Sequence, residues 1–317
     1  MAIIFAGPKP KAPVYNAQLP TVPSNPDSLI QFIAANEKLH KLKPDNEARI
    51  VWADSAHEKT QVSIVYLHGF SASEGEGEPI HRDIAKKFAC NLYLSRLAEH
   101  GIDTVDQLIN LTADNYWESA KQAYSIGKQL GDSVIIIGTS TGASLALQLA
   151  ATYPDVYALI LLSPNIAIND PYAWLLNDPW GLQIARTMTG SKYVISKDTR
   201  DIYKQYWNVP YRLEAVVQLQ EMLETAMVPE TFHKVHQPVQ MLYYYKDQIH
   251  QDSVVKVDAM IKMFDQLGTP AKKKVLLAMP KAGDHVIGSY IKSGDVKGVE
   301  QQIEGFLISV VGLEPKF

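Results

Sequence analysis

The pattern Gly138-Thr-Ser140-Thr-Gly142 could hold a reactive hydroxyl at the tip of a tight turn. A β-branched, apolar stretch at 133–137 precedes it, and a helical pattern at 143–150 follows it. Such a strand–turn–helix lifts a serine hydroxyl clear of the backbone, and the glycines let strand and helix pass where a Cβ would clash. We therefore predict that Ser140 is a nucleophile with a positive φ. The alternative is an ordinary glycine-rich turn in which Ser140 caps the helix.

A second apolar stretch, residues 62–67, runs into His68-Gly69-Phe70. Acyl transfer needs two backbone N–H groups aimed at the developing oxyanion. We expect one from Thr141, the residue after the nucleophile, and the other from Phe70. His68 comes too early in the chain for a catalytic base, so it is either a structural residue bonding this loop or a core histidine.

The Ser-Glu-Gly-Glu-Gly-Glu segment at 73–78 follows this loop. Three glutamates among glycines are typical of a solvated, mobile flap. A charge filter at a pocket mouth is a weaker interpretation. A metal site is weaker still, because no other ligand types are close in the sequence.

A serine nucleophile of this kind is followed along the chain by an acid and then a histidine. Asp247 lies at the carboxyl end of the expected strand 239–245 and is our choice of acid. Asp252 is the runner-up, and we expect it to cap a helix that starts near residue 253. His285 lies on a loop after the expected strand 274–278 and is the predicted base. We expect structural or surface roles for the other histidines, including His100.

Composition narrows the possible classes of function. A chain of 317 residues with 46% hydrophobic content can form one α/β domain with an insertion or two small domains. A net charge of −4 gives no electrostatic case for a nucleic-acid partner. The single cysteine, Cys90, excludes an intrachain disulfide and is expected to be a buried apolar residue.

No run approaches the ~18 apolar residues of a membrane span. Residues 1–7 are apolar but too short for the apolar core of a secretory signal, and they lack a basic start. We expect a cytoplasmic protein. The alternative is an exported or membrane-anchored protein whose N-terminal segment has been trimmed. The oligomeric state is open.

The elements that must position these residues alternate along the chain. A proline-rich arm at 7–26 and a helix at 27–42 come first. From residue 49 onward, strands separated by helices predict a doubly wound, mostly parallel sheet. The expected strands are 50–53, 62–67, 92–94, 133–137, 156–162, 239–245 and 274–278, and the expected helices are 79–89, 114–130, 142–152, 254–267 and 296–309.

One connection is too long for a simple crossover. Residues 164–238 are rich in aromatic side chains and read as several short helices. We predict that they form a helical cap whose aromatic residues mostly pack together, with a few lining a pocket. The expected division is therefore an arm and helix at 1–48, an α/β core at 49–163 and 239–317, and the cap between them.

The chain resembles the α/β-hydrolase superfamily, and within it the carboxylesterase and monoacylglycerol-lipase-like branch, over residues 49–310. The resemblance implies a helical cap after the sixth core strand. It also implies hydrolysis of a small-molecule ester with an apolar acyl group through an acyl-enzyme, with no metal and no organic cofactor. Thr141-Gly142-Ala143 departs from the branch, which often has Met or Gln followed by two glycines. The segments that carry the resemblance are Leu67-His-Gly-Phe-Ser-Ala72, Leu97-Ala-Glu-His-Gly101, Asp114-Asn-Tyr-Trp117, Gly138-Thr-Ser-Thr-Gly142, Lys246-Asp247 and Gly283-Asp-His285.

Three hypotheses of function follow. The first is an esterase acting on medium-chain or monoacylglycerol-like esters. The second keeps the same three residues but cleaves an amide or peptide bond. The third is a non-catalytic binding protein on a hydrolase scaffold, which would be expected to have lost one of the three residues. A haloalkane dehalogenase or an epoxide hydrolase would carry Asp at position 140, so the serine argues against both.

Overall fold

The computed structural model describes residues 7–317, so all but the last residue of the apolar start at 1–7 lies outside it. Its main sheet has seven strands in the order β1-β3-β2-β4-β5-β8-β9. Every neighbouring pair is parallel except β1 with β3, which confirms the doubly wound, mostly parallel sheet. The strands are β1 (Arg49–Val51), β2 (Thr60–Leu67), β3 (Asn91–Leu94), β4 (Gly131–Thr139), β5 (Val156–Leu162), β8 (Val239–Tyr243) and β9 (Lys274–Ala278), each at a predicted position.

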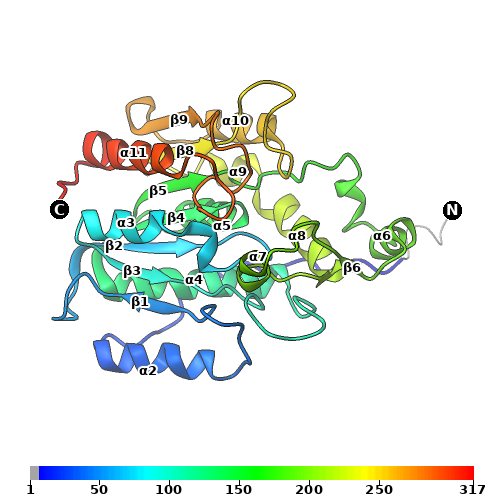
Figure 1. Cartoon of the computed structure of the whole chain (residues 1–317), viewed down its shortest axis with the longest axis horizontal. Helices are drawn as coiled ribbons and strands as arrows, with labels where there is room; N and C mark the ends of the chain where they lie inside the picture. Colours follow the sequence, from blue (N-terminus) through cyan, green and yellow to red (C-terminus); the bar gives the residue numbers. More distant parts are fainter. Residues whose placement is uncertain (1–6) are drawn as a thin grey trace.

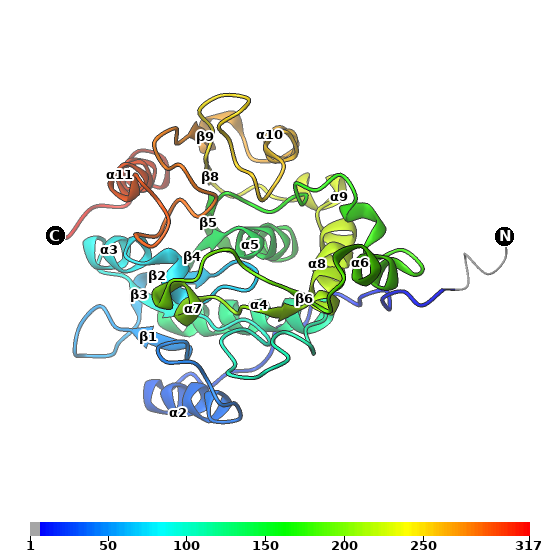
Figure 2. The same cartoon turned by 45° about the vertical axis from the view of Figure 1, so that its right-hand side comes forward.

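Alternate side chains of the central strands feed two apolar cores, one on each face of the sheet. Ile136 packs on one face and its neighbours Ile135 and Ile137 on the other, so the centre of a strand such as β4 must be apolar on both faces. Figure 2 shows helices on both sides of the sheet. One face carries α4 (Ala113–Leu130), α5 (Thr141–Thr152) and α10 (Val257–Asp265), and the other carries α3 (Ile80–Lys87) and α11 (Val296–Phe306).

Residues 164–238 form several short helices, as predicted, and lie to the right of the sheet in Figure 1. They also contain a two-stranded ribbon, β6 (Tyr193–Val194) with β7 (Tyr211–Arg212), which the sequence did not indicate. Two-residue strands are too short to show a period. The helices are η2 (Ala173–Leu175), α6 (Gly181–Thr189), α7 (Asp201–Tyr206), α8 (Leu213–Ala226) and α9 (Pro229–Phe232).

The proline-rich arm has neither helix nor strand from residue 7 to residue 24, as expected, and lies against α4. Trp117 donates from Nε1 to the carbonyl of Asn16, and the buried Lys121 donates to the carbonyl of Gln18. The helix after the arm, α2 (Pro26–Glu37), ends five residues earlier than predicted, because Leu42 instead pairs with Ile102 in an isolated bridge.

The remaining short elements are η1 (Glu74–Gly77), η3 (Ala271–Lys273) and η4 (Leu307–Val311). Among the described residues, 7–317, no helix combines the length and the apolar character needed to cross a membrane.

Candidate active site

Ser140 stands between β4 and α5 with φ 53° and ψ −118°, a strained backbone for a residue with a side chain. The crossing of strand and helix explains this strain. A Cβ on Gly138 would lie 2.6 Å from the backbone of Ala143, and one on Gly142 would lie 2.0 Å from the carbonyl oxygen of Leu67. The positive φ and the need for both glycines are therefore confirmed.

His285 lies on the loop after β9, and its Nδ1 is 2.6 Å from Oδ2 of Asp252. Both side chains are buried. The other carboxylate oxygen, Oδ1, accepts from the amides of Val254 and Val255 at 2.9 and 3.1 Å. Oδ2 therefore accepts the Nδ1 proton, which leaves Nε2 as the basic nitrogen. This Nε2 is buried and has no hydrogen-bond partner within residues 7–317.

The expectation that Asp247 is the partner of His285 is wrong. After β8 the chain turns out and back, with Tyr245 bridging Gln251. Asp247 lies at the exposed tip of this turn, where Oδ1 accepts from the amide of His250 at 2.8 Å. The returning segment of this turn places Asp252 beside Tyr244, whose carbonyl accepts a hydrogen bond from the Asp252 amide at 3.1 Å.

The second expectation for Asp252 is partly wrong as well. Its carboxylate does accept backbone N–H groups, but those of a turn, because α10 begins only at Val257. The sequence alone does not separate the two aspartates, since each accepts the amide of the residue three positions later, as an aspartate at a turn does.

Burial and charge oppose each other at this pair. Burial lowers the pKa of His285, but the charge and the hydrogen bond of Asp252 outweigh it, and the net shift is upward from 6.5. Burial raises the pKa of Asp252, but His285 and the bonded amides outweigh it, and the net shift is downward from 3.8. Asp252 is therefore ionised at neutral pH and strengthens His285 as a base.

Two backbone amides are available beside Ser140. Thr141 opens α5, where the first amides have no intrahelical acceptor, and the Phe70 amide donates no hydrogen bond within residues 7–317. The amides on either side of Phe70 are both occupied. Gly69 donates to Oε2 of Glu76 at 2.5 Å, and Ser71 donates to Nε2 of His100 at 3.0 Å.

His68 and His100 are structural, as expected. His68 donates from Nδ1 to the carbonyl of Gly69 at 3.0 Å and accepts the amide of Leu97 on Nε2 at 3.0 Å. Burial lowers the pKa of His68 to about 4 and that of His100 further. Both rings therefore stay neutral and bond the loop that carries Phe70.

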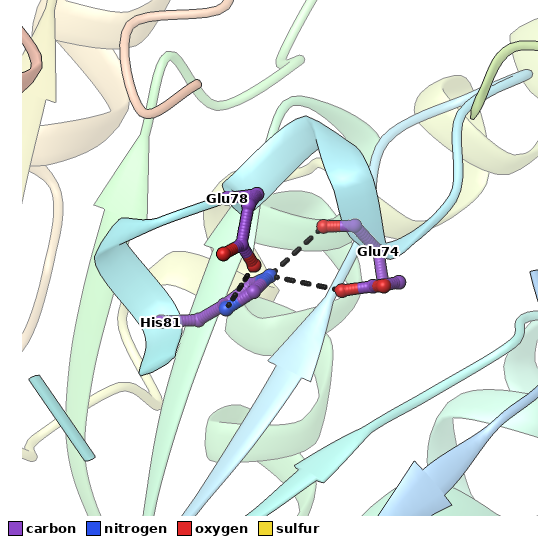
Figure 3. Close-up of side chains that lie close together, drawn as sticks. All are labelled: Glu74, Glu78 and His81. Carbon is purple, nitrogen blue, oxygen red and sulfur yellow. Dashed lines mark hydrogen bonds and ion pairs between the residues drawn. The ribbon is translucent and has the colours of Figure 1, made fainter. Parts of the chain in front are cut away.

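The prediction of a solvated flap at 73–78 is wrong, because Glu74 and Glu76 are both buried. Figure 3 shows how the first is held, with Glu74 and Glu78 on either side of His81. Arg82 lies 3.3 Å from Glu74 and 2.8 Å from Glu78 and compensates their charge. Glu74 and Glu78 are paired within the structure, which glycine content and charge count did not reveal.

Ser140 and His285 line the same cavity of about 510 Å³. Its other walls come from the loop after β2, from the segment after β8 and from residues 164–238. Apolar and aromatic side chains contribute much of the lining, namely Phe70, Ile168, Val194, Tyr203, Trp207, Val209, Tyr211, Val216, Leu219, Tyr244, Val254 and Val286. The hydroxyl of Thr141 accepts a hydrogen bond from Nδ2 of Asn165 at 3.3 Å.

Solved structures with the same architecture match most of the chain. A metagenome-derived lipolytic enzyme superposes with a TM-score of 0.68 at 15% identity, over 84% of this chain and 99% of that one. The chain has the α/β-hydrolase fold. The monoacylglycerol lipase of Paleococcus ferrophilus superposes with a TM-score of 0.60 at 14% identity, over 83% of this chain and 98% of that one. The Butyrivibrio proteoclasticus protein Est1E, solved with ferulic acid, superposes with a TM-score of 0.56 at 16% identity, over 84% of this chain and 95% of that one.

Sequence comparison adds one curated relative of this α/β-hydrolase chain. A thermostable monoacylglycerol lipase from Bacillus sp. strain H-257 is 27% identical over 114 residues, which are 36% of this chain and 44% of the lipase. The match therefore spans less than half of that lipase. No protein-family model matches the chain.

The two candidate acids allow a matched test. We expect Asp252→Asn to slow labelling of Ser140 by a fluorophosphonate by at least ~100-fold, because the amide removes the charge that makes His285 a base. Asp247→Asn should label within about 3-fold of the natural protein, since Asp247 bonds only its own turn. Labelling rates followed by mass spectrometry decide the matter, and the opposite order would return the role to Asp247.

Proposed function

We propose that this protein is a serine hydrolase that cleaves carboxylic esters through an acyl-enzyme, with Ser140 as nucleophile, His285 as base and Asp252 as acid. The observation that carries the proposal is the pairing of a strained serine with a buried carboxylate–imidazole pair on the walls of one cavity. The amides of Phe70 and Thr141 are the proposed oxyanion donors.

In the proposed reaction, Oγ of Ser140 attacks the ester carbonyl carbon while Nε2 of His285 takes the hydroxyl proton. The negative charge that develops on the carbonyl oxygen is met by the two amides. The tetrahedral intermediate then expels the alcohol, which receives the proton from Nε2, and the acyl group stays on Ser140. A water molecule repeats the same steps, releases the carboxylic acid and restores the serine.

The cavity supports an apolar acyl group of moderate size. Its volume of about 510 Å³ falls in the range of small-molecule sites. Ile168, Val209 and Leu219 contribute apolar surface to its wall. The names of the similar proteins, which include a lipolytic enzyme and monoacylglycerol lipases, point to the same class of substrate. The finer proposal is a medium-chain or monoacylglycerol-like ester.

A series of p-nitrophenyl esters of increasing acyl length tests this directly. We expect kcat/KM to peak at a medium chain length, because a longer chain exceeds the cavity and a shorter one leaves apolar wall uncovered. Ser140→Ala should lower the rate at least ~1000-fold with every ester, since the acyl-enzyme cannot form. Equal rates for the two proteins would overturn the proposal, and a faster matched anilide would favour an amidase.

The same reaction predicts a pH profile. His285 must be unprotonated to take the proton, and the charge and hydrogen bond of Asp252 raise its pKa. We therefore expect kcat/KM to rise with pH through a midpoint above 6.5, the ordinary value for histidine. In Asp252→Asn the midpoint should fall along with the plateau. A midpoint unchanged by this substitution would contradict the pairing of Asp252 with His285.

A further inference from the structure

One buried carboxyl beside the nucleophile has no role in the proposed reaction. Glu76 lies in the middle of η1, and only 2% of its surface is exposed. It nevertheless lines the same cavity as Ser140 and His285. Carboxyl groups are almost never fully buried unless they are paired, so this position needs a physical reason.

The contacts of Glu76 place it against the loop that carries the proposed oxyanion donor. Its Oε2 accepts the amide of Gly69 at 2.5 Å. A Cβ on Gly69 would lie 2.7 Å from Oε1 of Glu76 and 3.0 Å from Cβ of Ser140. The carboxyl and the nucleophile therefore meet at the same glycine, and only a glycine fits between them.

Glu76 and His100 together restrict the position of the Phe70 amide. The peptide before this amide is held by Glu76 through Gly69, and the residue after it is held by His100 through Ser71. Phe70 itself donates no hydrogen bond within residues 7–317. Two fixed neighbours leave its N–H little freedom to turn.

The segment that carries Glu76 is anchored on both sides. Arg82 pairs with Glu74 and Glu78, which flank His81 in Figure 3. The carbonyl of Gly75 accepts from the hydroxyl of Ser289 at 2.8 Å. Although Glu74, Glu78 and His81 have ligand atoms within 4.8 Å of one another, Arg82 already supplies a cation to both carboxylates, so we interpret this cluster as the anchor.

We propose that Glu76 is a positioning residue, which holds the His68–Gly69 peptide so that the Phe70 amide that follows it points at the oxyanion, and that it performs this role as a neutral acid. The proposal rests on the proposed ester hydrolysis and identifies what orients one of its two oxyanion donors.

The surroundings of Glu76 favour the neutral form. Burial is the largest influence on the pKa of Glu76 and raises it, and the charge of Asp284 raises it further. The hydrogen bond from Gly69 and the charge of His285 lower this pKa, and the net result is a pKa of about 8. Asp284 is itself paired with Lys292 at 3.2 Å. The other titratable groups that its charge affects are the phenols of Tyr66 in β2, Tyr116 in α4 and Tyr203 in α7, which carry no charge at neutral pH.

The protonation state of Glu76 determines how kcat changes with pH. Below about 8 the carboxyl is protonated and adds no charge beside the oxyanion. Above this pH it ionises, and a carboxylate close to the oxyanion opposes the negative charge of the transition state. Asp252 already supplies the counter-charge for the imidazolium. We therefore expect kcat to decline as the pH rises through the pKa of Glu76.

Two substitutions separate geometry from charge. Glu76→Gln keeps a carbonyl oxygen for the Gly69 amide, so we expect kcat at neutral pH within about 3-fold of the natural protein and no alkaline decline. Glu76→Ala removes the acceptor, so we expect kcat to fall about 10- to 100-fold with little change in KM, because the oxyanion exists only in the transition state. Glu58→Gln, at an exposed glutamate outside the cavity and outside this anchor, should change neither kcat nor its pH profile.

Thermal unfolding of each variant shows whether the loop is intact. The proposal is overturned if folded Glu76→Ala keeps its kcat, if it changes KM alone, or if Glu76→Gln keeps the alkaline decline. An equal loss in Glu58→Gln would also overturn it, because the effect would then not be specific to Glu76.

A readout without ester turnover separates this proposal from the proposed function. The infrared difference spectrum between the natural protein and Glu76→Gln should contain the carbonyl band of a protonated carboxyl about 2 pH units below the pKa of Glu76 and lose it about 2 units above. Labelling by a fluorophosphonate should slow in Glu76→Ala as kcat does, since the phosphonyl oxygen needs the same amide. If no ester is hydrolysed but both results hold, only the choice of substrate fails. If esters are hydrolysed and both results fail, only the role of Glu76 fails.

Discussion

The close crossing of β4 and α5 at Ser140 is the constraint on which the rest of the site depends. Backbone atoms occupy the space that a Cβ would need at Gly138 and at Gly142, and the chain can turn between them only with a positive φ at Ser140. The large apolar cores on both faces of the sheet hold strand and helix in this contact. The position of Ser140 in this strained turn then determines where a base, an acid and two amides have to lie.

Each of these partners is held by bonds within its own loop. Asp252 uses one carboxylate oxygen for two amides of its turn and the other for His285, so the imidazole cannot rotate without losing a buried bond. The amide of Phe70 is fixed through the residues on either side of it. The arrangement is rigid before any substrate arrives, which is what electrostatic stabilisation of a transition state requires.

Much of the fold could be predicted from the sequence because local patterns of apolar residues and glycines determine its strands and turns. Stretches such as residues 134–137 of β4 are apolar at every position, and the glycines around Ser140 indicate a crowded turn. His285 could be placed because few histidines follow the last strand. Asp252 could not be preferred over Asp247, because the choice depends on how a turn folds back on β8, which periodicity does not encode. Glu76 was misjudged because its burial depends on contacts with residues distant in sequence, such as Ser289 to Gly75.

The most direct test of this account is a crystal structure of the protein with Ser140 modified by a phosphonate. The account predicts the phosphonyl oxygen about 2.7–3.1 Å from the amide nitrogens of both Phe70 and Thr141. It also predicts Nε2 of His285 within hydrogen-bond distance of Oγ of Ser140, and Asp252 still on Nδ1. A phosphonyl oxygen that points away from these two amides, or a modified residue other than Ser140, would contradict it.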